Sequence, residues 1–380
     1  MISGLKNLAI ELLTRVRIDS NPAEERAFMV YSEDRASYLQ FGPYLEALEG
    51  CRVLYLTSAP DDPLLKSSPD HLTVGYLRWL APNFLAGTDA RLLMVTMPEL
   101  GCPGAPRPQK TRCVYIFHSL ISVHMGYPEG AFDHYDDFFC TGPHHQQELE
   151  KRFADLGRPP PRLHQVGYAK LDAIHAEHQT YAPRHPELET VLVAPSWATE
   201  NILSLYGTEL VRQLLGAGYR VVVRPHPCFF QSLYPEGQKV VADLERAFGG
   251  DSRFVLEKTI HGNDSFHEAA LMIGDWSGAA FEYAFATARP VLFVDTPPKV
   301  RNPNWKACGL PVFEDVTRYE VGRVVGGLDG LLATVKELLG EGDEGRSRRR
   351  ALRQEKVYHF GSSAEVGARL LEQLLAEGKS

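Results

Sequence analysis

The stretch ALMIGDWSGAAFEYAFATARPVLFVD, residues 270–295, decides the fold class. It starts with a short apolar run at 270–274, continues through a helical pattern at 277–286 and ends in a second apolar run at 290–294. Two buried strands joined by one helix pair in parallel, because the helix carries the chain back along the sheet. The stretch therefore predicts a βαβ unit.

The same alternation extends toward the N-terminus. Seven further runs are short, apolar and bounded by glycine, proline or polar residues, as buried parallel strands are. These runs lie at 52–57, 91–96, 112–117, 135–140, 190–195, 219–224 and 253–256. Helical patterns lie between them, among them 144–154, 207–216 and 238–248. The alternation predicts an α/β protein built from doubly wound, Rossmann-like domains with parallel sheets.

The 380 residues are enough for two domains. A proline-rich stretch at 158–161 and a polar stretch at 175–189 interrupt the alternation, so we expect the linker within about 165–189. The expected domains are 1–170 and 171–360, followed by a helix within 361–380. Ligands of such folds bind at the carboxyl ends of the strands, in the cleft that we expect between the domains.

Composition excludes several classes of protein. Hydrophobic residues make up 44% and charged residues 23%, which is typical of a folded globular protein. The 48 acidic residues outnumber the 40 basic ones, so we expect no nucleic acid partner. Six scattered cysteines without a Cys-x-x-Cys pair indicate thiols in a reducing compartment. We expect neither a metal site nor a cofactor.

The N-terminal residues 1–17 predict an amphipathic helix, with Leu8, Leu12, Leu13 and Val16 at helical spacing. Charged residues interrupt the apolar run long before the ~20 residues that a membrane span needs. Two interpretations stand: the helix packs on its own domain, or it lies against a membrane surface. We therefore expect a cytoplasmic protein, which the second interpretation places at the inner face of the cell membrane.

The charged stretch GDEGRSRRRALRQEK, which follows the last predicted strand, also has two interpretations. Its arginines form either the solvated face of a helix or contacts to phosphate or anionic lipid.

A histidine follows the strand predicted at 112–117 directly. His118 is therefore expected at the edge of the sheet where a substrate binds. An imidazole titrates near neutral pH and can accept a proton from an attacking hydroxyl. The alternatives are a structural histidine and a metal site with His124, Asp133 and His134, whose spacing matches no familiar ligand set.

Three segments that follow strands of the second sheet carry groups that suit a phosphate. They are APSWATEN with Ser196, VVVRPHP with Arg224 and His226, and IGDWSG with Asp275, Ser277 and Gly278. Hydroxyl groups and the bare N–H groups of a helix N-terminus bind phosphates, and a glycine lets the ligand approach. Burying a cation at a strand end costs free energy unless an anion pairs with it.

Together these segments predict a diphosphate or phosphodiester donor, although plain helix caps explain Ser196 and Ser277 as well. The sequence contains no Walker P-loop and no G-x-G-x-x-G motif, which argues against the common ATP, GTP and dinucleotide sites.

The order of these segments resembles the CDP-glycerol glycerophosphotransferase family, which makes teichoic acids and related polymers. The matching segments are FHS (117–119), FDHYD (132–136), GYAKLD (167–172), APSW (194–197), RPHP (224–227), DWSGAAFEYA (275–284) and RPVLF (289–293). The resemblance covers about 110–300, and the last three segments are its specific part. After the first histidine the family pattern is Gly-Thr-Pro-Leu, where this chain has Ser-Leu-Ile-Ser at 119–122.

The resemblance implies a GT-B architecture, in which two Rossmann-like domains face a cleft and the last helix crosses back to the first domain. It implies transfer of glycerol phosphate, or a related alditol phosphate, from a CDP-linked donor to a lipid-linked or polysaccharide acceptor, with release of CMP. His118 would be the base, His226 would face the donor phosphate, and the DWSG segment would lie at the donor diphosphate. On this basis the first domain takes the acceptor and the second the nucleotide donor.

Two other functions remain open. A GT-B glycosyltransferase or epimerase that acts on a UDP-sugar has a similar cleft, and a non-catalytic relative would only bind a nucleotide or an anionic polymer.

Overall fold

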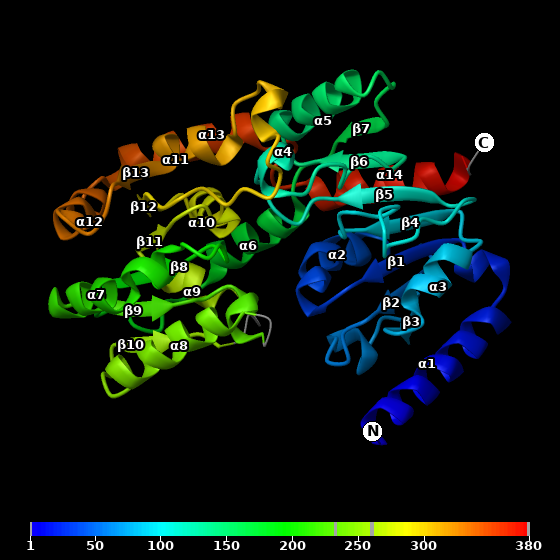
Figure 1. The fold of residues 1–380 in the computed structure, drawn as a ribbon, viewed down its shortest axis with the longest axis horizontal. Coiled ribbons are helices and arrows are strands. Elements are labelled where there is room, and N and C mark those ends of the chain that lie inside the picture. Colours follow the sequence, from blue (N-terminus) through cyan, green and yellow to red (C-terminus); the bar gives the residue numbers. More distant parts are fainter. Residues whose placement is uncertain (1, 232–233, 259–261, 378–380) are drawn as a thin grey trace. The chain divides into compact units, whose positions relative to one another are not determined.

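The computed structural model describes residues 2–231, 234–258 and 262–377. The chain forms two compact units (Figure 1). Unit 1 consists of Met1–His118, Tyr127–Asp172 and Val357–Ser380, and unit 2 consists of Ser119–Gly126 and Ala173–Lys356. The chain therefore leaves unit 1 directly after His118, contributes eight residues to unit 2 and returns. Sequence alone did not indicate this excursion.

Unit 1 is built on a parallel sheet of seven strands in the order β3-β2-β1-β4-β5-β6-β7. The strands are β1 (Phe28–Ser32), β2 (Val53–Thr57), β3 (Leu72–Tyr76), β4 (Leu92–Val95), β5 (Arg112–Ile116), β6 (Asp137–Cys140) and β7 (Arg162–Gln165). The register aligns Tyr31 with Val95 and Val95 with Tyr115. The carboxyl ends of β1, β4 and β5 therefore lie at one level of the sheet edge.

The helices of unit 1 flank this sheet. They are α1 (Ile2–Ser20), α2 (Arg35–Ala47), α3 (Ala81–Gly87), α5 (Pro143–Asp155), the first turn of α6 (Ala169–Thr180) and α14 (Ser363–Glu377), with the 3₁₀ turns η1 (Ala23–Arg26) and η2 (Pro63–Leu65). Helix α14, red in Figure 1, packs against α2, and its Ala368, Leu371 and Leu374 join the buried core of unit 1. The last helix thus belongs to the same unit as the first strands.

Unit 2 contains a parallel sheet of six strands in the order β10-β9-β8-β11-β12-β13. The strands are β8 (Thr190–Ala194), β9 (Arg220–Val223), β10 (Phe254–Leu256), β11 (Leu271–Gly274), β12 (Val291–Val294) and β13 (Gly322–Val325). Strands β8, β11 and β12 are buried along their whole length, as the apolar runs predict. Their core continues into the helices on the faces of the sheet.

The helices of unit 2 follow its strands. They are α4 (Val123–Gly126), α7 (Ile202–Gly216), α8 (Pro235–Phe248), α9 (Asp264–Glu268), α10 (Gly278–Thr287), α11 (Phe313–Val321), α12 (Leu331–Leu339) and α13 (Gly342–Lys356), with the 3₁₀ turns η3 (Pro227–Phe230) and η4 (Trp305–Cys308). The βαβ unit predicted from 270–295 is present as β11, α10 and β12. Two doubly wound parallel sheets confirm the predicted α/β fold.

The structure also differs from the sequence analysis in its strands and in the expected linker. Strands β1, β3, β7 and β13 were not predicted, and residues 175–180, expected within a linker, continue helix α6. Strand β7 is exposed or half-buried along its length and polar in sequence, so it lacks the apolar run that marks the other strands.

Helix α1 is amphipathic as predicted, but its apolar stripe faces outward. Leu13 and Val16 are 70% and 68% exposed, whereas Glu11 and Ile18 are fully buried. The Glu11 carboxylate accepts hydrogen bonds from the backbone N–H groups of Arg78 (3.0 Å) and Leu80 (2.9 Å), which holds this face against unit 1. None of the described helices is long and apolar enough to cross a membrane.

Candidate active site

His118 lies two residues beyond the end of β5 in the sequence, at the carboxyl edge of the unit 1 sheet. Its Nδ1 lies 3.2 Å from the carbonyl oxygen of Thr96, the residue after β4. A carbonyl oxygen only accepts, so Nδ1 carries the proton and Nε2 is the basic nitrogen. Nε2 lies 3.1 Å from the phenol oxygen of Tyr127, which donates to it. The ring therefore presents its basic nitrogen to a hydroxyl group.

The main chain of His118 is held as firmly as its ring. Its carbonyl oxygen accepts a hydrogen bond from the Tyr168 phenol at 2.9 Å and a longer one from Gln40 Nε2 at 3.5 Å. The phenol of Tyr115, a fully buried residue, lies 3.3 Å from Nδ1. Contacts on several sides fix the ring orientation, as a positioned acid–base residue requires.

In unit 2, Asp275 follows β11 and is buried, and it binds the loop after β8; we call this arrangement the latch. Its two carboxylate oxygens accept the backbone N–H groups of Ser196 (2.6 Å) and Ile202 (2.9 Å), so they tie together the loop that connects β8 to α7. Burial raises the pKa of Asp275, although the backbone N–H donors act in the opposite direction. The carboxylate thus shapes the strand-end loops from beneath, and Ser196 is positioned by its backbone.

The N-terminus of α10 is occupied by a side chain of the same unit. Ser277 is the N-cap residue, and its hydroxyl makes no capping hydrogen bond. A Cβ atom placed on Gly278 would overlap the Ser119 hydroxyl. The close approach that Gly278 permits is therefore that of Ser119, at the position where the chain departs from the family pattern.

Arg224 finds its counter-charge within the protein. Its guanidinium is 8% exposed, donates to the Gly262 carbonyl (3.0 Å) and the Ser265 hydroxyl (2.9 Å), and lies 3.6 Å from the Glu257 carboxylate. Burial lowers the pKa of Arg224, and Glu257 opposes this shift. Because Glu257 supplies an anion within the protein, Arg224 does not require a phosphate ligand, contrary to the expectation from sequence.

His226 belongs to a basic and aromatic group that we call the strand-end cluster: Trp197, His226, Lys299 and Arg301. Lys299 Nζ lies 4.1 Å from the centre of the Trp197 ring, and the Arg301 guanidinium carbon lies 5.8 Å from it. The centres of the Trp197 and His226 rings are 6.2 Å apart. Residues that follow β8, β9 and β12 thus meet at one edge of the unit 2 sheet.

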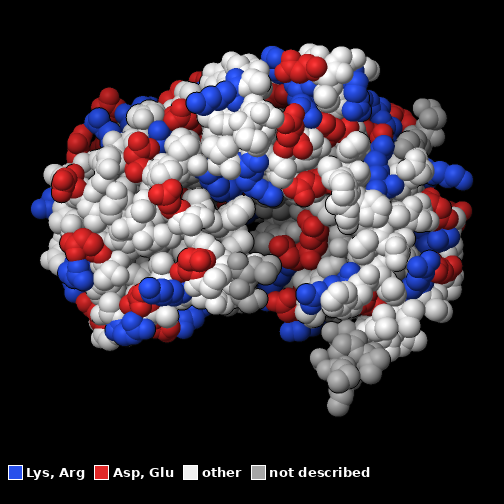
Figure 2. All heavy atoms as spheres, viewed as in Figure 1, with Lys and Arg blue, Asp and Glu red and all other residues white. Residues whose placement is uncertain are grey.

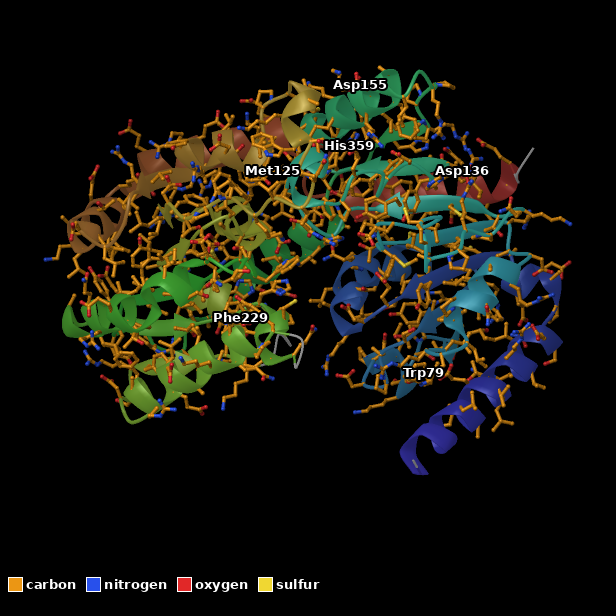
Figure 3. The ribbon with its side chains drawn as sticks, viewed as in Figure 1. Trp79, Met125, Asp136, Asp155, Phe229 and His359 are labelled. Carbon is orange, nitrogen blue, oxygen red and sulfur yellow. The ribbon has the colours of Figure 1, made fainter. Side chains whose placement is uncertain are left out.

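Within the strand-end cluster the Lys299 ammonium is the desolvated charge, whereas the Arg301 side chain is exposed. Desolvation, followed by the neighbouring Arg301, lowers the pKa of Lys299 to about 8. The backbone N–H of Arg301 donates to the carbonyl oxygen of Met125, labelled in Figure 3, at 3.0 Å. The segment that follows β12 is thereby anchored on α4, with its two cations directed at Trp197.

Sequence analysis missed Lys299 and Arg301, because they lie five and seven residues beyond the end of β12. The expectation for strand ends covers only residues close behind each strand. Trp197 lies within APSW, where the prediction rests on Ser196. Among the described residues, no three histidine, cysteine, aspartate or glutamate side chains form a group suited to a metal ion.

Comparisons with known proteins support the fold. No family model matches the sequence, and no curated protein matches it. Among solved structures, the wall teichoic acid polymerase TagF has 12% identity and a TM-score of 0.56, with 98% of each chain covered. A Listeria monocytogenes protein described as a UDP-N-acetylglucosamine 2-epimerase has 16% identity and a TM-score of 0.61, with 93% of this chain and 97% of that one covered.

The UDP-GlcNAc 2-epimerase of Methanocaldococcus jannaschii has 11% identity and a TM-score of 0.51, with 91% of this chain and 99% of that one covered. Coverage of whole chains identifies the fold as GT-B, with two Rossmann-like domains. At these identities the likeness extends to the fold alone.

Proposed function

We propose that this chain is a transferase that moves glycerol phosphate, or a related alditol phosphate, from a CDP-linked donor to an acceptor hydroxyl and releases CMP. The strand-end cluster is the observation that carries this proposal, because three basic side chains converge on one indole ring. Such a group suits a diphosphate that carries several negative charges. One protein of the same fold, the TagF polymerase, was soaked with CDPG.

His118 is the proposed base. An acceptor hydroxyl that replaces the Tyr127 phenol at Nε2 transfers its proton to that nitrogen as its oxygen attacks the phosphorus that bears the alditol. A new oxygen–phosphorus bond forms while the bond from that phosphorus to the bridging oxygen breaks. CMP leaves as an anion and needs no proton. His226, Lys299 and Arg301 stabilise the negative charge on the phosphoryl oxygens.

Of the residues predicted from sequence, His118 and His226 are assigned to chemistry and donor binding. Ser196, Ser277 and Gly278 lie on the loops around the donor. Asp275 holds the loop after β8 in place through the backbone N–H of Ser196, and Arg224 binds the start of α9 through Ser265. A lipid-linked or polysaccharide acceptor completes the reaction.

A UDP-sugar enzyme of the same fold is the second candidate, and the epimerase-like neighbour with a TM-score of 0.61 favours it. The protein is incubated separately with CDP-glycerol and with UDP-sugars, and released CMP or UDP is measured. CMP alone supports the proposal, and UDP alone contradicts it. Binding of a nucleotide without release of either product indicates the non-catalytic relative.

The roles of the histidines are tested by His118→Ala and His226→Ala, with His134→Ala as the control because His134 is exposed. Loss of a positioned base lowers turnover by roughly 10²–10⁴-fold. The control keeps normal turnover, and all three variants keep the melting temperature within a few degrees. Near-normal turnover in both His118→Ala and His226→Ala contradicts the assignment.

We also propose that α1 binds a membrane surface. Figure 2 shows a mostly uncharged surface over the described part of α1, and Figure 3 shows Trp79 on the neighbouring segment. Trp79 is 69% exposed and Leu13 is 70% exposed. The Arg78 guanidinium lies 5.8 Å from the centre of the Trp79 ring, and Arg15 is an exposed residue of α1 itself. Exposed leucine and tryptophan with arginine at the rim suit the interface of an anionic bilayer.

Sedimentation with lipid vesicles tests this surface. We expect binding to vesicles that contain phosphatidylglycerol, weaker binding to pure phosphatidylcholine, and loss of both in a Leu13→Glu, Val16→Glu variant. Leu205→Glu is the control, because Leu205 is 43% exposed on α7 of unit 2. A dimer in light scattering that the double variant converts to a monomer assigns the surface to a second copy instead.

A further inference from the structure

The basic nitrogen of His118 is occupied by another side chain of unit 1. Nε2 accepts the phenol O–H of Tyr127 at 3.1 Å, and the two rings meet edge to face with their centres 5.6 Å apart. His118 is partly exposed to solvent, whereas Tyr127 is only 5% exposed. A neutral imidazole has one nitrogen that can take a proton. While the phenol is bound to that nitrogen, His118 cannot take a proton from another hydroxyl.

Tyr127 lies in a loop and not within the sheet. It follows α4 directly, in a bend at the residue where the chain returns to unit 1. Its ring packs edge to face on Phe132, with the ring centres 5.0 Å apart. The main chain just before it belongs to unit 2, where the Met125 carbonyl accepts the backbone N–H of Asn302 at 3.3 Å. The bond from the phenol to His118 can therefore open without the loss of a hydrogen bond between strands.

Displacement of this phenol has a cost that a water molecule cannot offset. Leaving a buried hydroxyl without its partner disfavours the displaced state by about tenfold or more. Water gains one hydrogen bond to Nε2 in exchange and has no further groups with which to bind the protein. An acceptor that is the end of a polymer or a lipid-linked sugar brings further groups, and their contacts can offset the loss. The phenol therefore discriminates against the smallest competing hydroxyl.

An activated donor needs this discrimination, because water outnumbers every acceptor and hydrolysis wastes the donor. We infer that Tyr127 guards His118 against water and so suppresses hydrolysis of the bound CDP-linked donor until an acceptor arrives. Tyr127 acts through His118 and is a positioning residue, not a catalytic one. This inference rests on the proposed function, because it concerns the same reaction with water in place of the acceptor.

The suppressed reaction is a simple displacement. The water oxygen bonds to the phosphorus that bears the alditol, and the bond from that phosphorus to the bridging oxygen breaks. One proton of the water passes to Nε2 of His118. The products are CMP, which leaves as an anion, and the free alditol phosphate, which carries the oxygen of the water.

Turnover of CDP-glycerol without any acceptor tests this role. The full chain is incubated with CDP-glycerol in water enriched in a heavy oxygen isotope, and CMP and labelled glycerol phosphate are measured. We expect Tyr127→Phe to raise hydrolysis roughly tenfold, because phenylalanine keeps the ring contact with Phe132 and leaves Nε2 open to water. A variant that only loosens the fold loses turnover and does not gain it. Tyr55→Phe is the matched control, because it removes a buried phenol that donates to Asp62 at 2.8 Å, and it should leave hydrolysis unchanged.

Two further measurements show whether Tyr127 acts through the imidazole. The double variant His118→Ala, Tyr127→Phe should lose the gain in hydrolysis. In nitrogen NMR spectra of the imidazole, the Nε2 signal of His118 should move toward that of a free, unprotonated nitrogen in Tyr127→Phe, and it should stay in place in Tyr55→Phe.

Measurable hydrolysis that is unchanged or slower in Tyr127→Phe overturns the inference. A gain that persists in the double variant also overturns it, and so does an Nε2 signal that does not move. Failure of the proposed function is distinct: no form of the protein then releases CMP, although the Nε2 signal still responds to Tyr127→Phe.

Discussion

The substitution Asp275→Asn separates a structural latch from a ligand contact. The Asp275 side chain is 3% exposed, and its two oxygens accept the N–H groups of Ser196 and Ile202. An asparagine offers one oxygen and one NH₂ group. One of the two backbone N–H groups therefore faces another donor and loses its acceptor.

The cost follows from this mismatch. A buried donor without an acceptor costs about 1–3 kcal/mol, and here both the backbone N–H and the new NH₂ group are affected. Removal of a buried charge offsets part of this loss, because burial already raises the pKa of Asp275. A net loss of about 2 kcal/mol lowers the melting temperature of a unit of this size by roughly 4–8 °C.

The assay is thermal unfolding by circular dichroism, followed by CDP titration. Asp243→Asn is the control, because Asp243 is 40% exposed on α8 and pairs with Arg246 of the same helix at 2.8 Å. It should shift stability by less than about 0.5 kcal/mol. If Asp275 holds the loop from Ser196 to Ile202 in place, Asp275→Asn loosens this loop and weakens CDP binding. An unchanged melting temperature with tighter CDP binding refutes the latch, because it is the result expected when a repulsive charge beside a diphosphate is removed.

Three further predictions concern single residues. Lys299 has a pKa lowered to about 8 from 10.5, so the folded protein releases this proton before the unfolded chain does, and stability rises with pH between these values. Lys299→Met should abolish that slope in thermal scans, and it should also remove the fall in CDP affinity expected in the wild type between about pH 7 and 9. Gly167→Ala should destabilise the protein by more than about 1 kcal/mol and expose the C-terminal segment to protease. Gly167 has a φ of 97°, and a Cβ atom there would overlap the main-chain carbonyl of Tyr358 in that segment. Gly157→Ala is the control for backbone strain alone, because Gly157 has a φ of 63° and open space around it. Arg349→Met should cost about 3–5 kcal/mol in urea unfolding, because it leaves the buried carbonyl groups of Ala288 and Val321 without this donor and removes the 2.7 Å partner of the half-buried Glu341 carboxylate. Arg348→Met, at an exposed site with only longer contacts to Glu341, should cost almost nothing.

The pattern of apolar residues predicted most of the strands that are buried on both faces. It did not predict strands such as β7, whose residues are polar and exposed or half-buried. Strands β8, β11 and β12 are continuous apolar runs, so burial alone marks them. Strand β1 is also fully buried, and its apolar run Phe28–Tyr31 is as long as that of β12, so length alone does not explain why it was not predicted. Strand β7 has no buried residue and forms only because β6 offers it an edge. Its existence depends on the tertiary fold, which a local pattern does not contain.

For the charged groups of the candidate site, sequence predicted the position along the chain but not the direction of the side chain. Sequence placed Arg224 and His226 at one strand end, but the direction of each side chain depends on neighbours far along the chain. Glu257 and Ser265 draw Arg224 inward, and Trp197 lies beside His226. Lys299 reaches the same edge because α4 anchors the segment after β12, and no local pattern encodes that contact.

Two of the five arginines of α13 depart from the predicted solvated face, whereas Arg346, Arg348 and Arg350 are exposed as that interpretation expects. The sequence left a solvated face or a phosphate contact as the interpretations of this stretch. Arg349 and Arg353 are instead 1% and 7% exposed, and they donate to the Ala288 and Phe285 carbonyls. Both carbonyls lie at the C-terminal end of α10, where groups without helical partners need external donors. The buried C-terminal end of α10 therefore binds two arginines that the sequence pattern assigns to solvent.

The departure at Ser119 links these observations. The resemblance places a donor diphosphate at the DWSG turn, where the bare N–H groups of α10 attract an anion. In this chain the Ser119 hydroxyl lies against Gly278 in that position, and a glycine at 119, as in the family pattern, would leave the space open. A diphosphate must then rely more on donors at the neighbouring strand ends, where Lys299 and Arg301 lie beside Trp197. The lowered pKa of Lys299 fits this assignment, because an anion bound beside a desolvated cation restores the interactions that the cation lost with water.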